Sequence, residues 1–194
     1  MAVSSRGMRL LIKALVPVII AVAAFIGIGG ARPAKAQPAT LTLLNTPARV
    51  YFSPHGGATD ALVEELGKVK GTILVQAYSF TSAPIAQALK DAAQRGVKVR
   101  VVLDKSQRGE RYTSATFLVR AGIPVWIDAS HQIAHNKVMI LDDETVVTGS
   151  FNFTKAAEQS NAENLLILKD KGLAAIYRKN WETHQAHSDV FEDK

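Results

Sequence analysis

The chain has 194 residues, with 23 Lys plus Arg, 17 Asp plus Glu and no cysteine. Its formal net charge of +6 at first suggests an anionic partner such as nucleic acid or a membrane surface. The lack of cysteine excludes disulfide bonds, thiol nucleophiles and thiolate zinc sites.

Residues 1–36 have the pattern of a secretory signal peptide. Arg6, Arg9 and Lys13 precede an apolar stretch, and a small-x-small cleavage site follows at 34–36. The apolar stretch is short for a spanning helix, which needs roughly 20 residues. We therefore expect a cleaved signal, a periplasmic or secreted protein and no stable membrane association; a retained N-terminal anchor is the alternative. Without this leader, 18 basic residues face 17 acidic ones, a net charge of +1, so global charge says little about the partner.

The rest of the chain is expected to comprise a tether at 37–48 and one compact domain at 49–194. Apolar periodicity and turn residues predict alternating elements, with strands at 49–52, 72–80, 97–103 and 123–127 and helices at 58–69, 83–95 and 111–121. A polar loop is expected at 104–110. After residue 127 the alternation of strand and helix patterns ends. The apolar pattern then predicts a hairpin at 137–141 and 145–147, a strand at 163–168 and a last helix at 173–187. This order indicates the α/β class, a mixed sheet with helices on both faces.

The segment from His135 to Asn152 carries the most informative polar residues. His135 and Lys137 are two positions apart, as are Ser150 and Asn152, so each pair shares a face of an extended strand. Asp142 is five positions beyond Lys137 and would point the other way. We therefore interpret Asp142 as a structural partner or turn residue.

These residue types suit a phosphodiester better than a metal ion, because an ammonium beside an imidazole repels a divalent cation. Lys137, Ser150 and Asn152 can stabilise the extra charge on the non-bridging oxygens as phosphorus becomes five-coordinate. His135 can attack phosphorus or protonate the leaving alkoxide. Gly149 lets the backbone bend closely at this point. We expect a reaction that uses no metal and no other cofactor.

The spacing of these residues resembles the HKD motif of the phospholipase D superfamily. The matching pattern is His135-x-Lys137-x4-Asp142 followed by Gly149-Ser150-x-Asn152. The segments at 50–54, 75–80 and 162–164 resemble the small, exported, single-motif nuclease branch of that superfamily.

The resemblance implies a phospholipase D-like fold and a role for each matching residue. It implies that His135 is the nucleophile and forms a phosphohistidine intermediate, and that Glu163 hydrogen-bonds and orients this histidine. It also implies that Asp142 holds the backbone of the motif. The phosphate ligands would be Lys137, Ser150 and Asn152.

The chain contains one such motif, because His55, His131, His184 and His187 all lack a lysine two positions later. In-line displacement places the nucleophile and the leaving group on opposite sides of phosphorus, so a second group should act as the acid. Family members with two motifs supply two histidines from one chain. We therefore expect a two-fold homodimer in which two His135 side chains meet across the interface.

Three other histidines could be considered metal ligands from their spacing. His131 lies four positions before His135 and is interpreted as a rim or solvent residue, because Lys137 opposes a cation. His184 and His187 have an i, i+3 spacing that could hold zinc, but a polar helix face is the favoured interpretation.

A basic loop follows the predicted strand at 97–103. Lys105, Arg108 and Arg111 would lie past the carboxyl end of that strand, where ligands of α/β proteins tend to bind. We expect these residues to contact substrate phosphates, with a solvated loop as the alternative.

The leading hypothesis is a nonspecific endonuclease that hydrolyses DNA, with RNA as a second substrate. A phospholipase D or cardiolipin hydrolase is the enzymatic alternative, which a retained anchor would favour. A catalytically silent nucleic-acid-binding module is the third.

Overall fold

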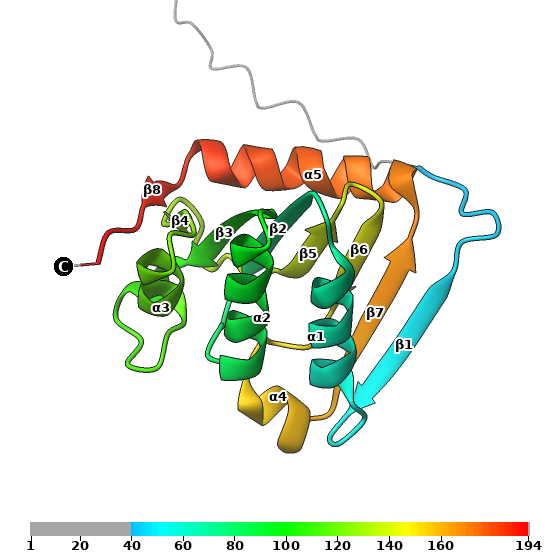
Figure 1. Ribbon diagram of the computed structural model, residues 1–194, viewed down its shortest axis with the longest axis horizontal. Coiled ribbons are helices and arrows are strands. Elements are labelled where there is room, and N and C mark those ends of the chain that lie inside the picture. The colour runs from blue at the N-terminus through cyan, green and yellow to red at the C-terminus, as the bar shows by residue number, and fades with distance from the viewer. Residues whose placement is uncertain (1–39, 194) are drawn as a thin grey trace, which may run out of the picture. The chain divides into compact units, whose positions relative to one another are not determined.

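The computed structural model describes residues 40–193, so the expected signal peptide at 1–36 lies outside the described residues. An eight-stranded sheet runs through this part of the chain, in the order β1-β7-β6-β5-β2-β3-β4-β8 (Figure 1). The strands are β1 (Ala48–Ser53), β2 (Thr72–Ala77), β3 (Lys98–Asp104), β4 (Val125–Asp128), β5 (Lys137–Leu141), β6 (Thr145–Gly149), β7 (Glu163–Lys169) and β8 (Asp189–Val190).

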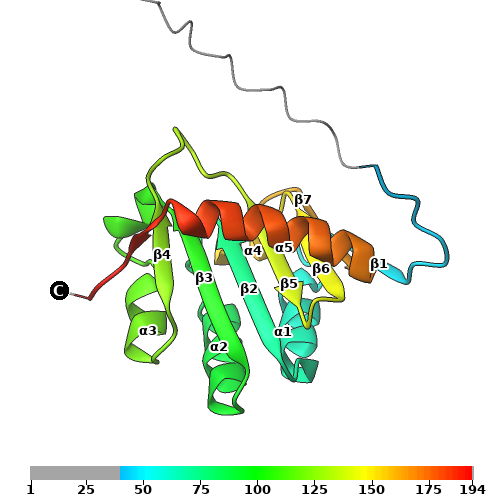
Figure 2. The ribbon, with the colours of Figure 1, turned by 90° about the horizontal axis from the view of Figure 1, so that it is seen from above.

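The sheet is mixed, as expected. β2, β3 and β4 run parallel, and the other pairs are antiparallel. The helices are α1 (Ala58–Lys68), α2 (Ala83–Gln94), α3 (Ala115–Arg120), α4 (Lys155–Gln159) and α5 (Lys171–Ala186), with a 3-10 turn, η1, at Lys105–Arg108. Figure 2 shows α1, α2 and α3 on one face of the sheet and α5 across the other. Between residues 40 and 193, no helix combines the length and apolar character that crossing a membrane requires.

Two apolar cores stabilise the two faces unequally. On the larger side, α1 and α2 bury Leu62, Leu66, Ile85 and Leu89 completely against the sheet. Each such side chain contributes about 1.5–3 kcal/mol relative to exposure. On the smaller side, α5 buries Trp181, whose Nε1 donates to a strand carbonyl of β2 at 2.8 Å.

The third helix begins later than the sequence predicts. Residues 111–114 form turns instead of helix, because they are bound to distant parts of the chain. The Ser114 N–H donates to the carbonyl of Phe80 at 2.8 Å, and the Thr113 hydroxyl donates to Oε1 of Gln107 at 3.1 Å. Nothing in the local apolar spacing signals these contacts.

Helix α4, which the sequence analysis did not predict, caps α1. The Glu158 carboxylate on α4 accepts hydrogen bonds from the N–H groups of Gly57 at 3.1 Å and Thr59 at 2.8 Å. These N–H groups lie at the start of α1, where a helix has no internal acceptors. A residue about a hundred positions away therefore caps α1.

Asp142 anchors the turn between β5 and β6 to the start of β2. Its carboxylate accepts hydrogen bonds from the N–H groups of Lys70 at 3.0 Å, Gly71 at 2.7 Å and Thr72 at 3.0 Å. Burial alone would raise the pKa of Asp142, but these three hydrogen bonds lower it below its usual value. Asp142 lies at the end of β5 opposite Lys137, so the structure gives it an anchoring position.

We expect Asp142→Ala to lower the free energy of unfolding by about 2–3 kcal/mol near neutral pH, because three N–H groups lose a charged acceptor. The lowered pKa means that this contribution is present above the unfolded-state pKa and is lost as the pH falls through the folded-state pKa. Urea unfolding curves of the parent and D142A should therefore converge as the pH is lowered. The control is Asp143→Ala in the same turn, which removes an exposed ion pair with Arg178. A difference between parent and D142A that does not change with pH would contradict this interpretation.

Candidate functional site

The ends of five strands meet at one edge of the sheet. Ala77 at the end of β2 pairs with Lys137 at the start of β5, and Gly149 at the end of β6 pairs with Leu165 near the start of β7. The last residue of β1 pairs with the first residue of β7. This register brings together most of the predicted site residues, namely His135, Lys137, Ser150, Asn152 and Glu163.

His135 is exposed at this edge, in the extended segment just before β5. Its ring packs against Tyr78, with 4.7 Å between the ring centroids and 59° between the planes. Within residues 40–193, neither ring nitrogen of His135 has a hydrogen-bond partner. The aromatic contact positions the imidazole and leaves its nitrogens open to an incoming group.

Lys137 is buried directly behind His135, with 6% of its surface exposed. Its Nζ donates to the carbonyl of His135 at 2.9 Å and lies 5.1 Å from the ring centroid of Tyr78. Burial lowers the pKa of Lys137, and the charge of Glu163 partly offsets this. Among the described residues the ammonium forms no ion pair, although an unpaired buried charge is costly. An anion bound at this edge would supply the missing partner.

Ser150 and Asn152 follow a bend that only glycine fits well. Gly149 has φ 148°, and a Cβ at this position would overlap the carbonyl oxygen of Asn164. The Ser150 N–H donates to that carbonyl at 3.1 Å, and the Asn164 N–H donates to the Ser150 hydroxyl oxygen at 3.1 Å. The Ser150 hydroxyl hydrogen therefore remains available to donate to a phosphate oxygen.

The side chain of Asn152 carries a buried oxygen, Oδ1, that has no hydrogen-bond partner among the described residues. Leaving a buried polar atom unpaired costs about 1–3 kcal/mol, so such atoms are uncommon and need an explanation. This oxygen needs a donor, which a phosphate cannot supply, so it is the amide Nδ2 of Asn152 that would donate to a phosphate oxygen.

Glu163 lies at the same edge, but its observed partner differs from the expected one. Its Oε1 accepts a hydrogen bond from the side-chain amide of Asn161 at 3.1 Å. A hydrogen bond to His135 is not found in residues 40–193, and the charge of Glu163 acts on Lys137 instead. The orienting role of Glu163 stays a prediction.

The basic loop at 105–111 follows the carboxyl end of β3. Its three predicted substrate contacts, Lys105, Arg108 and Arg111, are all exposed. Nζ of Lys105 donates to the carbonyl of His131 at 3.1 Å, and Arg108 pairs with Asp189 at 2.9 Å. Arg111 lies over the ring of Tyr112 at 5.4 Å. A substrate phosphate would have to compete with Asp189 for Arg108, and contact with substrate stays a prediction for this loop.

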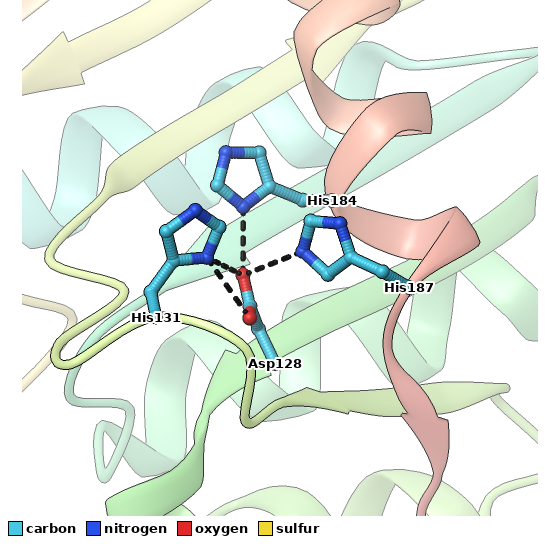
Figure 3. Close-up of side chains that lie close together, drawn as sticks. All are labelled: Asp128, His131, His184 and His187. Atoms are coloured by element: carbon cyan, nitrogen blue, oxygen red, sulfur yellow. Dashed lines mark hydrogen bonds and ion pairs between the residues drawn. The ribbon is translucent and has the colours of Figure 1, made fainter. Parts of the chain in front are cut away.

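The structure also forms a polar cluster that the sequence analysis missed, made of Asp128, His131, His184 and His187 (Figure 3). Oδ2 of Asp128 lies 2.9 Å from Nδ1 of His131, 2.7 Å from Nδ1 of His184 and 3.3 Å from Nε2 of His187. Burial alone would raise the pKa of Asp128, but the three imidazoles hold the pKa of this carboxyl well below its usual range.

This cluster corrects the interpretation of the three histidines as separate rim and helix-face residues. Asp128 ends β4, His131 follows in the next loop, and the other two histidines lie at the end of α5. Asp128 and His184 are 56 positions apart in the chain and His187 is further still, so sequence spacing could not join them. The i, i+3 spacing of His184 and His187 was the signal present in the sequence.

A family model described as "Cardiolipin synthase, PLD-like domain" matches residues 62–185. This match covers more than half of the chain and includes the whole motif from His135 to Asn152. The chain belongs to the phospholipase D superfamily. Its mixed sheet and helices on both faces agree with that membership. The activity that follows from the membership is that of a phosphodiesterase of this superfamily.

Relatives within the superfamily carry different names. A "Phospholipase D" of Rickettsia felis is 42% identical over 144 residues, which are 74% of this chain and 72% of the relative. The "Mitochondrial cardiolipin hydrolase" of Homo sapiens is 32% identical over 130 residues, 66% of this chain and 52% of the relative. The crystal structure of the phospholipase D family member Nuc from Salmonella typhimurium is 34% identical with a TM-score of 0.74, and the match covers 76% of this chain and 99% of Nuc. These names leave the substrate of this superfamily member open.

We expect Lys137→Met to separate stability from activity. Replacing the buried ammonium by an apolar side chain of similar length should raise the free energy of unfolding by about 1–2 kcal/mol. The same change should lower kcat/KM for a phosphodiester about 10²- to 10³-fold, because a donor to the transition-state charge is lost. Urea unfolding and steady-state kinetics on one preparation measure both effects.

The matched control is Lys179→Met, which changes an exposed lysine of α5. K179M should leave both quantities near the parent values. If K137M lost stability and activity together, Lys137 would be a structural residue and not a phosphate ligand.

Proposed function

We propose that this protein is a metal-independent phosphodiesterase that hydrolyses nucleic acid as a nonspecific endonuclease, through a phosphohistidine on His135 and as a two-fold homodimer. The observation that carries the proposal is the exposed His135 imidazole next to the buried Lys137 ammonium, which forms no ion pair within residues 40–193. A nucleophile beside an uncompensated positive charge suits an anionic electrophile, and a phosphodiester is one.

In the first proposed step, a ring nitrogen of His135 attacks phosphorus. A P–N bond forms as the P–O bond to the leaving alkoxide breaks, and His135 of the second protomer gives that alkoxide a proton. In the second step, this second His135 takes a proton from water, and the resulting hydroxide attacks phosphorus and breaks the P–N bond. Lys137, Ser150 and Asn152 stabilise the non-bridging oxygens in both steps.

Nucleic acid is our first choice of substrate for two reasons. The match spans 99% of Nuc and 76% of this chain, so the matched part corresponds to nearly the whole of that small family member. The exposed cations Lys105, Arg108 and Arg111 follow the carboxyl end of β3, and β2, which runs parallel to β3, ends at the candidate site. A polymeric phosphate backbone could engage this loop while one of its phosphates lies at His135.

Phospholipid is the second candidate substrate. The relatives from Rickettsia felis and Homo sapiens are named phospholipase D and mitochondrial cardiolipin hydrolase. Both substrates present a phosphodiester, so the chemistry at His135 would be the same. Groups beyond the reacting phosphate decide between them.

Assays of the purified protein on plasmid DNA, RNA and cardiolipin-containing vesicles test this proposal. We expect strand cleavage that continues in excess EDTA well below the Tm, and a loss of about 10³-fold or more in His135→Ala. Gln132→Ala, in the same loop, is the control and should retain activity. Lipid turnover without strand cleavage would show that the substrate is phospholipid and not nucleic acid. Equal rates in the parent and H135A would show that His135 performs no catalysis and would favour a catalytically silent binding module. Cleavage lost in EDTA from a folded protein and restored by Mg²⁺, which prefers oxygen ligands to imidazoles, would exclude the metal-independent reaction.

The shared site is tested by mixing protomers. If one composite site needs both histidines, co-expression of equal amounts of parent and H135A chains should leave about a quarter of the parent activity, whereas independent protomers would leave about a half. Light scattering on the size-exclusion peak gives the mass of the active species. Full activity at the mass of one chain would overturn the dimer.

A further inference from the structure

The geometry points to a structural zinc site formed by Asp128, His131, His184 and His187. This site would connect the loop at 129–136, which carries His135, to the end of α5. It lies outside the catalytic residues described above, and the proposed phosphodiesterase reaction does not use it.

The four side chains lie close enough together to converge on one ion. Each offers one ligand atom, and these four atoms lie within 4.8 Å of one another. Zinc bonds nitrogen and oxygen ligands at about 2.0–2.1 Å, which places neighbouring ligands of a tetrahedron about 3.3 Å apart. The three distances from Oδ2 of Asp128 to the imidazole nitrogens are 2.7, 2.9 and 3.3 Å, at or slightly below this value. A small adjustment of the side chains would therefore admit the ion.

Hydrogen bonding alone satisfies this arrangement poorly. Three imidazole nitrogens lie within 3.3 Å of Oδ2, which has two lone pairs, and Nδ1 of His131 also lies 3.1 Å from Oδ1. The three rings are also close together, with centroids 4.7, 5.2 and 5.4 Å apart, so three imidazolium charges would repel one another. A cation at the centre removes both problems, because neutral imidazoles and a carboxylate all direct lone pairs at it.

Surrounding groups hold the ligands in place. The Ser130 N–H donates to Oδ1 of Asp128 at 3.1 Å, which helps to fix the carboxylate with Oδ2 near all three histidines. Nζ of Lys105 donates to the carbonyl of His131 at 3.1 Å, and the Ser130 hydroxyl to that of His187 at 3.5 Å. These contacts fix the backbone at two of the three histidines.

The cluster is anchored on one side and accessible on the other. The Asp128 side chain is fully buried at the end of β4, while the side chains of His184, His187 and His131 are 14, 33 and 46% exposed. An ion can therefore reach the site from solvent and bind against a fixed carboxylate.

The ligand set favours zinc in a structural role. Three imidazoles and one carboxylate provide four protein ligands, which fills the tetrahedral coordination that structural zinc prefers. A catalytic zinc keeps one position for water or substrate, and this set leaves none. The ion would instead stabilise the folded state, since the ligands come together only when β4, the loop and α5 are assembled.

Metal content and spectroscopy of the purified full chain test the site. After growth with zinc and dialysis, we expect about one zinc ion per chain by mass spectrometry of the metal. Co²⁺ added to the chelator-treated protein should give the strong visible absorption of a tetrahedral ion. Zinc added to the same protein should raise its Tm.

The variant for comparison is His131→Ala/His187→Ala, which changes the two more exposed ligands and leaves buried Asp128 intact. It should bind Co²⁺ at least about 10²-fold more weakly and lose the Tm response to zinc. Gln132→Ala is the matched control in the same loop and should behave like the parent.

The site would be overturned by substoichiometric zinc with no Tm response in the parent, by a weak octahedral Co²⁺ spectrum, or by equal Tm shifts in the parent and the double variant. None of these measurements depends on cleavage activity. A failed zinc site therefore leaves the proposed phosphodiesterase intact, and a failed phosphodiesterase leaves the zinc site intact.

Discussion

The constraint on which the candidate site depends is the positive charge of Lys137, which is buried without a carboxylate partner among residues 40–193. An apolar residue at position 137 would make the fold more stable. Removing the Lys137 ammonium from water costs free energy, and its contacts with a carbonyl and an aromatic face do not fully offset that cost. The fold nevertheless fixes it between neighbouring strands, with His135 in front of it. An anion at the edge would offset this cost, so stability and anion binding would be opposed at this residue.

The sheet register keeps this charge in place. Every second residue of β5 faces the larger core, so a shift of one residue would turn Lys137 to the α5 face and move the motif off the edge. Asp142 opposes such a shift, because its three backbone hydrogen bonds fix the other end of β5 to β2. Lys137 thus lies at the edge of the candidate site, and Asp142 holds the register from the opposite end of β5.

Much of this arrangement could be read from local patterns. The strand at Lys137–Leu141 was predicted with its observed bounds, because a fully apolar run follows the lysine and a polar turn ends it. Strand parity predicted that Asp142 would point away from the face of Lys137; in the structure it lies in the turn past the other end of β5 and bonds to the start of β2. The family resemblance supplied the functional roles, which local patterns could not.

What the sequence did not predict depends on contacts between distant residues. The start of α3 is set by Phe80 and Gln107, and the short helix α4 has too few residues for a periodic signal. Glu163 was assigned to His135 by resemblance, but in the structure it bonds to its neighbour Asn161. The cluster at Asp128 joins a strand end, a loop and a helix end, so only the folded chain shows that its histidines share one partner.

The unequal cores have a consequence for the order in which the protein loses structure. Only Ala174 and Trp181 of α5 are buried, whereas α1 and α2 together bury nine residues in the larger core. Amide hydrogens on α5 should therefore exchange through a partial opening that leaves the rest of the sheet folded. Because the end of α5 contacts the loop at 129–136, which carries His135, such an opening would disorder His135 before the rest of the sheet. Inactivation on heating would then precede global melting.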